Sequence, residues 1–215
     1  MNRVVNYVQR YVVLLIGLTI MAFGVAFSIK ADLGTSPISS VPYAVSEFTP
    51  LTVGTATIVM HCVFICIQIL LLRRKYQPIQ LMQLPVAFFF GYLTDFGMWA
   101  VQDITCTSYW QQWIICLIGI FLVALGVSLE VKANVVVLAG EGVVLAICKI
   151  FPVKFGTMKV AFDVTLVVIA CLLSLIFLGR IQGVREGTVA AAILVGLTAK
   201  QLGKVWARWK WPESK

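Results

Sequence analysis

The stretch GLTIMAFGVAFSIKA at residues 17–31 recurs as GIFLVALGVSLEVKA at residues 119–133. The match extends without a gap over residues 17–72 and 119–174, and 14 of these positions are identical. Apolar composition alone inflates such a score, but it does not explain the shared G-x6-G spacing, Lys-Ala dipeptide and P-x3-G-T motif. The chain therefore contains two copies of one sequence unit.

The composition places this repeat in a membrane. Of the 215 residues, 60% are hydrophobic and only 12% are charged, whereas soluble domains carry about 25% charged residues. A soluble fold of this size buries too small a fraction of its surface to hide so much apolar area. The net charge of +8 comes from basic residues at segment ends, so the expected partner is the lipid bilayer and not nucleic acid.

Six segments are long and apolar enough to span a bilayer as helices. Two further apolar segments, 36–48 and 138–150, are too short to span comfortably and are typical of re-entrant helices. The predicted fold is therefore an all-α polytopic bundle. The predicted spans are 11–29, 53–72, 78–100, 112–131, 156–178 and 187–206.

The Lys and Arg residues indicate whether the short segments cross. If they do not, and the N-terminus is cytoplasmic, 13 of the 17 basic residues lie inside and only Lys30, Arg180 and Arg185 lie outside. If all eight segments cross, the split is nine to seven. Positive loops favour the cytoplasm, which favours six spans and two cytoplasmic termini. Three spans per unit make residues 1–103 and 104–215 an inverted 3+3 repeat, although full crossing of the short segments stays open.

The first short segment follows Gly34-Thr35-Ser36-Pro37. Gly34 lets the chain turn, Ser36 can cap a helix, and Pro37 suits its first turn. A helix N-terminus there would present N–H groups and a positive dipole end to an anion. The alternative is an ordinary capped helix start in a surface loop.

The second short segment contains Gly140-Glu141-Gly142. A carboxylate inside an apolar stretch is a functional candidate by default, for binding a cation or carrying a proton. The alternative is a Glu at the cytoplasmic interface near Lys132.

Further ionisable residues lie within predicted spans. Lys159 and Asp163 are four residues apart and share a helix face, as a pathway pair or a structural ion pair. His61, the repeat mate of Asp163, is a candidate proton carrier or a packing residue. Asp95 is another proton-coupling candidate, or a residue near the outer interface. Glu141 and Asp163 complete the proton-coupling set.

Chemistry of other kinds is not indicated. No G-x-S-x-G, H-E-x-x-H or Walker A pattern occurs, so we expect no enzyme and no catalytic residues. The six cysteines lack C-x-x-C spacing, and we expect no disulfide, no metal site and no cofactor. The repeated G-x6-G is expected to permit close helix packing.

Four motifs together resemble the bacterial YczE/YyaS/YitT-type membrane proteins over residues 11–200. They are the run Ser28–Pro37, Gly140-Glu141-Gly142, Lys159 with Asp163, and the run Gly183–Thr188. The resemblance implies a bacterial inner-membrane protein with a transport role and names no substrate. That pattern has a proline before Gly-Glu-Gly where this chain has Ala139, so the resemblance does not fix the local backbone there.

These features predict a multi-pass inner-membrane transporter of a small solute. An anionic solute and proton coupling are the specific expectations, with alternating access between inverted halves. A passive channel with paired re-entrant helices and a non-transporting assembly partner are the alternatives. A homodimer stays open. The expected pathway residues are Gly34, Thr35, Ser36, Pro37, Gly140, Glu141, Gly142, Lys159 and Asp163.

Overall fold

The computed structural model describes residues 2–206, with side chains from residue 7 onward. Within these residues the regular structure is entirely helical, with eight α-helices and two short 3-10 helices. The helices are α1 (Asn2–Lys30), α2 (Pro37–Phe48), α3 (Val53–Leu72), η1 (Arg73–Lys75), η2 (Pro78–Met82), α4 (Gln83–Ala100), α5 (Tyr109–Ala133), α6 (Ala139–Ile150), α7 (Phe155–Leu178) and α8 (Glu186–Trp206).

Local signals explain several helix ends. Thr52 caps α3 with its hydroxyl, and Ser108 begins α5 in a capping box. These side chains accept amide protons that have no partner inside the helix. Helices α5 and α7 end at Asn134 and Gly179, both in the left-handed backbone region, where Asn and Gly are the favoured residues.

Six of the eight predicted segments match a helix to within three residues at both ends. The first span begins nine residues earlier than predicted, because helix formation continues through polar residues that an apolar criterion excludes. The span predicted over 78–100 begins as the 3-10 helix η2 and continues as α4 from Gln83. Residues 207–215, with Arg208, Lys210 and Lys215 of the charge count, lie outside the described residues, as does the Arg3 side chain.

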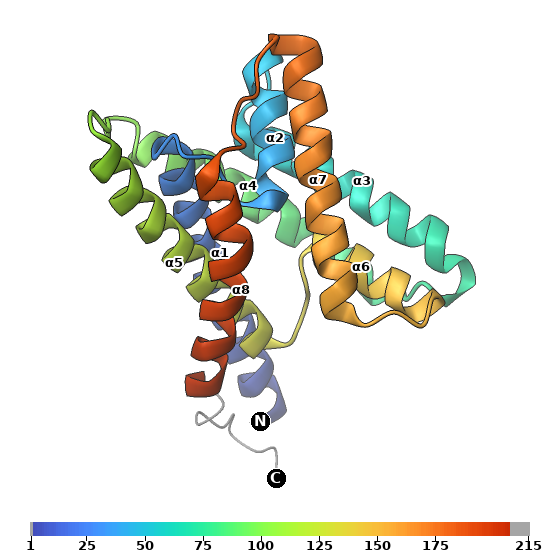
Figure 1. The fold of residues 1–215 in the computed structure, drawn as a ribbon. Coiled ribbons are helices and arrows are strands. Elements are labelled where there is room, and N and C mark those ends of the chain that lie inside the picture. Colours follow the sequence, from blue (N-terminus) through green and yellow to red (C-terminus); the bar gives the residue numbers. More distant parts are fainter. Residues whose placement is uncertain (1, 207–215) are drawn as a thin grey trace.

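Five described helices, α1, α3, α5, α7 and α8, are long and apolar enough to cross a membrane. Helix α4 is not among them, because its 18 residues include Gln83, Thr94 and Asp95. The chain is therefore a multi-pass, all-helical membrane protein. The start of α1 and the end of α8 lie at the same end of the bundle (Figure 1).

The centre of the bundle is the antiparallel pair α1 and α5, which makes the most extensive helix contact (Figure 1). The repeated glycines lie in this seam. A Cβ atom on Gly24 would lie 2.9 Å from the Gly119 carbonyl oxygen, and one on Gly17 would lie 3.0 Å from that of Gly126. The expectation that G-x6-G permits close helix packing is confirmed.

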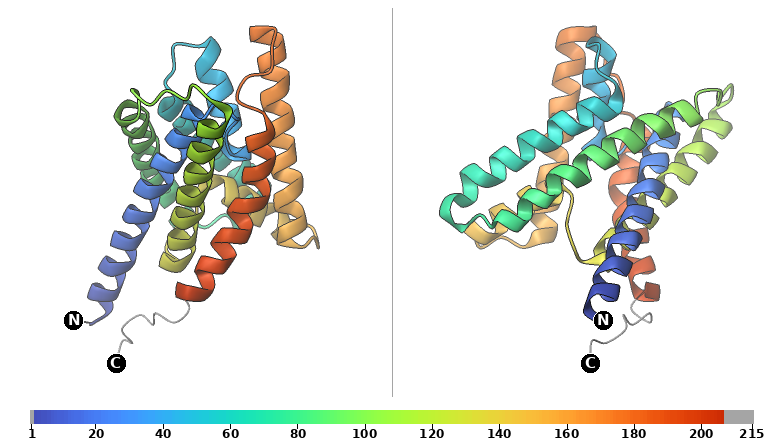
Figure 2. Two further views of the ribbon diagram at one scale, coloured as in Figure 1. Left: turned by 60° about the vertical axis from the view of Figure 1, so that its left-hand side comes forward. Right: turned by 180° about the vertical axis from the view of Figure 1, so that it is seen from behind.

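The remaining helices repeat one pattern of contacts in the two halves. Helix α2 packs on α7, and its counterpart α6 packs on α3. Helix α4 packs on α1, and its counterpart α8 packs on α5. One pair breaks the correspondence: α3 and α4 pack along each other and cross α1 obliquely (Figure 2), whereas α7 and α8 make almost no direct contact.

Candidate functional site

The two short helices begin next to each other inside the bundle. After α5, the linker 134–138 turns back toward the middle before α6 starts (Figure 1). A Cβ atom on Gly140 would collide with the Ile38 side chain of α2. The first turns of α2 and α6, and hence the positive ends of both helix dipoles, therefore meet between the halves.

Neither helix start is capped by a side chain. Ser36 is the N-cap of α2, but its hydroxyl donates to Ser39 Oγ at 3.0 Å and makes no cap bond. Ser36 thus stands at the predicted N-cap position, but its side chain does not cap the helix. Leu138, at the same place in α6, has no polar side chain. In α2, Pro37 has no N–H and the Ser39 N–H donates to the Ser36 carbonyl at 2.9 Å, so the Ile38 N–H is the first-turn amide that remains for another partner. In α6 the first turn keeps its amides, because no proline precedes or begins it.

The first half surrounds these turns with neutral polar groups. A cavity of about 30 Å³ is lined by Ser36, Ser39, Thr57 and His61, among others, which is room for about one water molecule. His61 is only 1% exposed, between the rings of Phe64 and Phe90. Its Nδ1 atom has no hydrogen-bond partner among the described residues.

The second half supplies charged groups at the repeat-equivalent positions. Lys159 and Asp163 form an ion pair with side chains that are 30% and 19% exposed. The half-buried Glu141 lies within electrostatic range of both residues. In the repeat alignment these three residues correspond to Thr57, His61 and Ser39 of the first half.

Glu130 is a buried carboxylate that the sequence analysis did not single out. It is 2% exposed, and its Oε1 accepts the Leu138 N–H at 2.7 Å. Its Oε2 has no hydrogen-bond partner among the described residues, and Glu141 is within electrostatic range. The repeat alignment could have found it, because Glu130 replaces Ser28 just as Glu141 replaces Ser39.

Two glutamines anchor the start of α6, and sequence reasoning also missed them. The fully buried Gln68 donates from Nε2 to Gln83 Oε1 at 2.9 Å and to the Ala139 carbonyl at 3.1 Å. A Cβ atom on Gly142 would lie 2.6 Å from Gln68 Oε1. Gly142 therefore packs closely against Gln68, and its place in the pathway stays a prediction.

One known protein family matches almost the whole chain. Residues 8–204 match the model of a family of unknown function, DUF6198. The chain belongs to this family. It is also similar to the uncharacterized protein YyaS of Bacillus subtilis (strain 168), with 28% identity over 127 residues. The match covers 59% of this chain and 62% of YyaS. No solved structure matches.

Within this DUF6198 member, the two loop motifs behind the sequence resemblance lie against each other. The Thr35 N–H donates to the Gly183 carbonyl at 3.0 Å, and the Gly187 N–H donates to the Leu33 carbonyl at 2.7 Å. Gly34 has φ +92°, and a Cβ atom there would lie 2.6 Å from the Arg185 nitrogen. Gly34 and Thr35 therefore pack directly against the loop before α8, and Thr35 is hydrogen-bonded to it.

Asp95 joins α4 to the start of α3. Its carboxylate accepts the Thr52 hydroxyl at 2.6 Å and the Gly54 N–H at 2.7 Å. The carboxylate complements the positive end of the α3 dipole. Gly54, which Asp95 contacts, lies two turns before His61 on α3. Asp95 therefore lies apart from the meeting point of α2 and α6.

A lateral groove of about 350 Å³ separates α7 from α8. Aliphatic side chains line most of it, and Pro37, Asp163 and Thr188 also reach it. The groove thus leads from the outside of the bundle to the first residue of α2 and to the ion pair. Among the described residues, no group of three His, Cys, Asp or Glu is placed to hold a metal ion.

Proposed function

We propose that the chain has six spans and two re-entrant helices, arranged as an inverted repeat. The helix order long, short, long, long occurs twice, and each short helix packs on the second long helix of the other half. The 18 residues of α4 cover about 27 Å, close to the hydrocarbon thickness of a bilayer. The basic residues favour cytoplasmic termini.

On this architecture, the protein is a transporter of a small anionic solute by alternating access. The observation that carries the proposal is the meeting of the α2 and α6 N-termini among buried polar side chains. Broken helices whose N-termini point at a shared midplane site are the recurring construction of secondary transporters. The Ile38 N–H of α2, the first-turn amides of α6 and the Lys159 ammonium would attract an anion.

Proton coupling follows from the carboxylates at the same place. Glu130, Glu141 and Asp163 would repel an anion while they are ionised, because like charges at short range interact strongly in a low-dielectric interior. Protonation of one carboxylate removes that repulsion. The solute is therefore expected to enter together with a proton.

The two helix pairs supply the gates. Gly54 of α3 packs closely against Gly91 of α4, whereas a Cβ atom added to its repeat mate, Gly156 of α7, would meet no other atom within 4 Å among the described residues. In the opposite state, α7 would close on α8 while α4 separates from α3. Such an exchange of two packings is the usual motion of inverted repeats.

The test begins with ligand identification. A thermal-shift screen of purified protein against small anions should find a stabilising compound, because a ligand that binds only the folded state raises its stability. Uptake of that compound into proteoliposomes should then saturate, show counterflow and rise with an inward proton gradient. Glu141→Gln should abolish the gradient effect, and Asp95→Asn should leave it intact. Linear flux without counterflow would instead identify a channel.

A further inference from the structure

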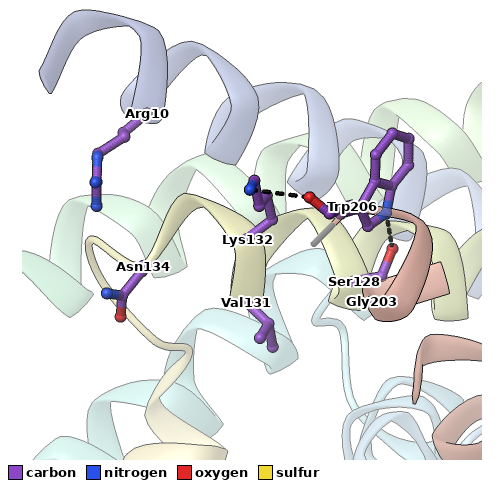
Figure 3. Close-up of a pocket in the computed structure, with 7 residues that line it drawn as sticks. All are labelled: Arg10, Ser128, Val131, Lys132, Asn134, Gly203 and Trp206. Atoms are coloured by element: carbon purple, nitrogen blue, oxygen red, sulfur yellow. Dashed lines mark hydrogen bonds between the residues drawn. The ribbon is translucent and has the colours of Figure 1, made fainter. Parts of the chain in front are cut away.

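A further pocket lies at the end of the bundle where α1 begins and α8 ends. It measures about 320 Å³ and lies between α1, α5 and α8 (Figure 3). Arg10 of α1 and Lys132 of α5 bring two cationic side chains to it, and Asn134 adds an amide. Figure 3 shows the Arg10 side chain extending toward Asn134.

Hydrogen bonds between helices hold the pocket in shape. The Trp206 Nε1 donates to Ser128 Oγ at 3.0 Å, and the Lys132 Nζ donates to the Trp206 carbonyl at 3.0 Å (Figure 3). Asn134 is fixed in the left-handed conformation that ends α5. The last turns of α5 and α8 are thereby tied together, with Arg10 on the facing helix.

The chemistry of the pocket fits a phosphate group. The described residues that line it include two cations, an amide, a hydroxyl and no carboxylate. A guanidinium binds phosphate oxygens in a bidentate manner, and an ammonium binds them as a point charge. Both cations also approach the negative ends of the α5 and α8 dipoles, so a bound anion must be held by side chains rather than by helix amides.

One wall of the pocket is apolar and faces outward. Val131 lines it and is 63% exposed, and Trp206 is a residue type enriched at the bilayer interface. The ligand would therefore touch hydrocarbon on one side and cations on the other. A lipid headgroup meets both requirements, and basic pockets between spans at a membrane surface are typical lipid sites.

We propose that this pocket binds the phosphate of an anionic phospholipid headgroup from the adjacent leaflet. The lipid would bridge α1, α5 and α8 and stabilise the folded bundle. The proposal requires only that this end of the bundle meets a leaflet, so it stands whether or not the protein transports a solute.

Thermal unfolding of the purified full chain in detergent tests the proposal. Phosphatidylglycerol should raise the midpoint by about 3 °C or more relative to phosphatidylcholine with the same acyl chains. The double variant Arg10→Gln, Lys132→Gln should lose that difference. The control Lys200→Gln, Lys204→Gln removes the same charge from α8 outside the pocket and should retain it. Equal effects of both lipids, or equal loss in the control, would overturn the proposal.

A second pair of variants keeps the charges and changes only the space. Gly203 lines the pocket. Among the residues that the structure describes, an added Cβ on Gly203 or on Gly196 would meet no neighbouring atom within 4 Å. Gly203→Leu should block the lipid-specific shift, whereas Gly196→Leu on the same helix should not. Both variants should fold, because Leu has a higher helix propensity than Gly. If inorganic phosphate alone reproduced the full shift, the ligand of the pocket would be a soluble anion and not a lipid.

Discussion

Glu130 holds the linker that brings the chain back toward the middle of the bundle. We expect Glu130→Ala to lower the free energy of unfolding by about 1–3 kcal/mol, because the buried Leu138 N–H loses its acceptor. Glu130→Gln keeps a carbonyl oxygen at that place and should cost less than about 1 kcal/mol. Denaturant unfolding in detergent, followed by tryptophan fluorescence, measures both. Equal losses for Ala and Gln would show that the hydrogen bond contributes nothing.

Gly142 and Gln68 form a pair that can be tested as a unit. Gly142→Ala places a methyl group 2.6 Å from Gln68 Oε1, and overpacking of this kind costs about 1–3 kcal/mol. Adding Gln68→Ala should recover part of that loss, so a double-mutant cycle should give a positive coupling between the two sites. Gly156→Ala is the control, because its Cβ would meet no neighbouring atom within 4 Å in the described part of the chain and helix propensity favours Ala. Additive effects of Gly142→Ala and Gln68→Ala would contradict direct contact.

Among single residues, those with an unusual local sequence could be predicted best. Glu141 between two glycines and the Lys159 and Asp163 spacing were evident, and the structure places them together. Glu130 was hidden because it precedes Lys132 at a predicted span end, where a Glu is ordinary. The roles of Gln68 and Gly142 depend on contact between α3 and α6, which sequence periodicity does not report.

At the scale of helices, the sequence predicted type and extent well. The apolar runs predict helix bounds that the structure reproduces for six of the eight segments, whereas the caps at Thr52, Ser108 and Asn134 emerged only from the structure. The start of α4 could not be predicted, because a 3-10 helix and an α-helix differ in hydrogen-bond register and not in hydropathy. Hydropathy also predicted a sixth span over residues 78–100. There α4, with 18 residues, is the shortest of the long helices and is not among the five that are long and apolar enough to cross a membrane.

The seam between α1 and α5 gives a prediction at this scale. Gly24→Leu would push side-chain atoms into the backbone of α5, since even a Cβ would lie 2.9 Å from the Gly119 carbonyl oxygen. We expect a loss of about 1–3 kcal/mol in unfolding free energy and a lower yield of folded protein. Gly196→Leu on α8 introduces the same side chain where no neighbouring atom of the described residues lies within 4 Å of a Cβ, and it should be neutral or stabilising. Comparable losses for the two variants would mean that the seam is not closely packed.

For the whole molecule, the repeat predicted the equivalence of the halves but not the difference between them. Two copies of one sequence unit can adopt two packings that differ by only a few kcal/mol, and the sequence does not say which copy adopts which. Here α3 lies along α4, while a groove of about 350 Å³ separates α7 from α8. That difference is the physical basis for expecting a second state.

Cross-linking across the groove tests that second state. In a chain whose six native cysteines are replaced by serine or alanine, Val164→Cys with Ala192→Cys places one thiol on each wall. If α7 closes on α8 during transport, oxidation should form a disulfide only slowly without solute and faster with it, and the cross-linked protein should stop transporting. Thr52→Cys with Asp95→Cys is the control, because these two side chains already lie within 2.6 Å of each other where α4 meets the start of α3 and should cross-link readily without solute. Undiminished uptake after complete cross-linking of the α7 and α8 pair would rule out this gate.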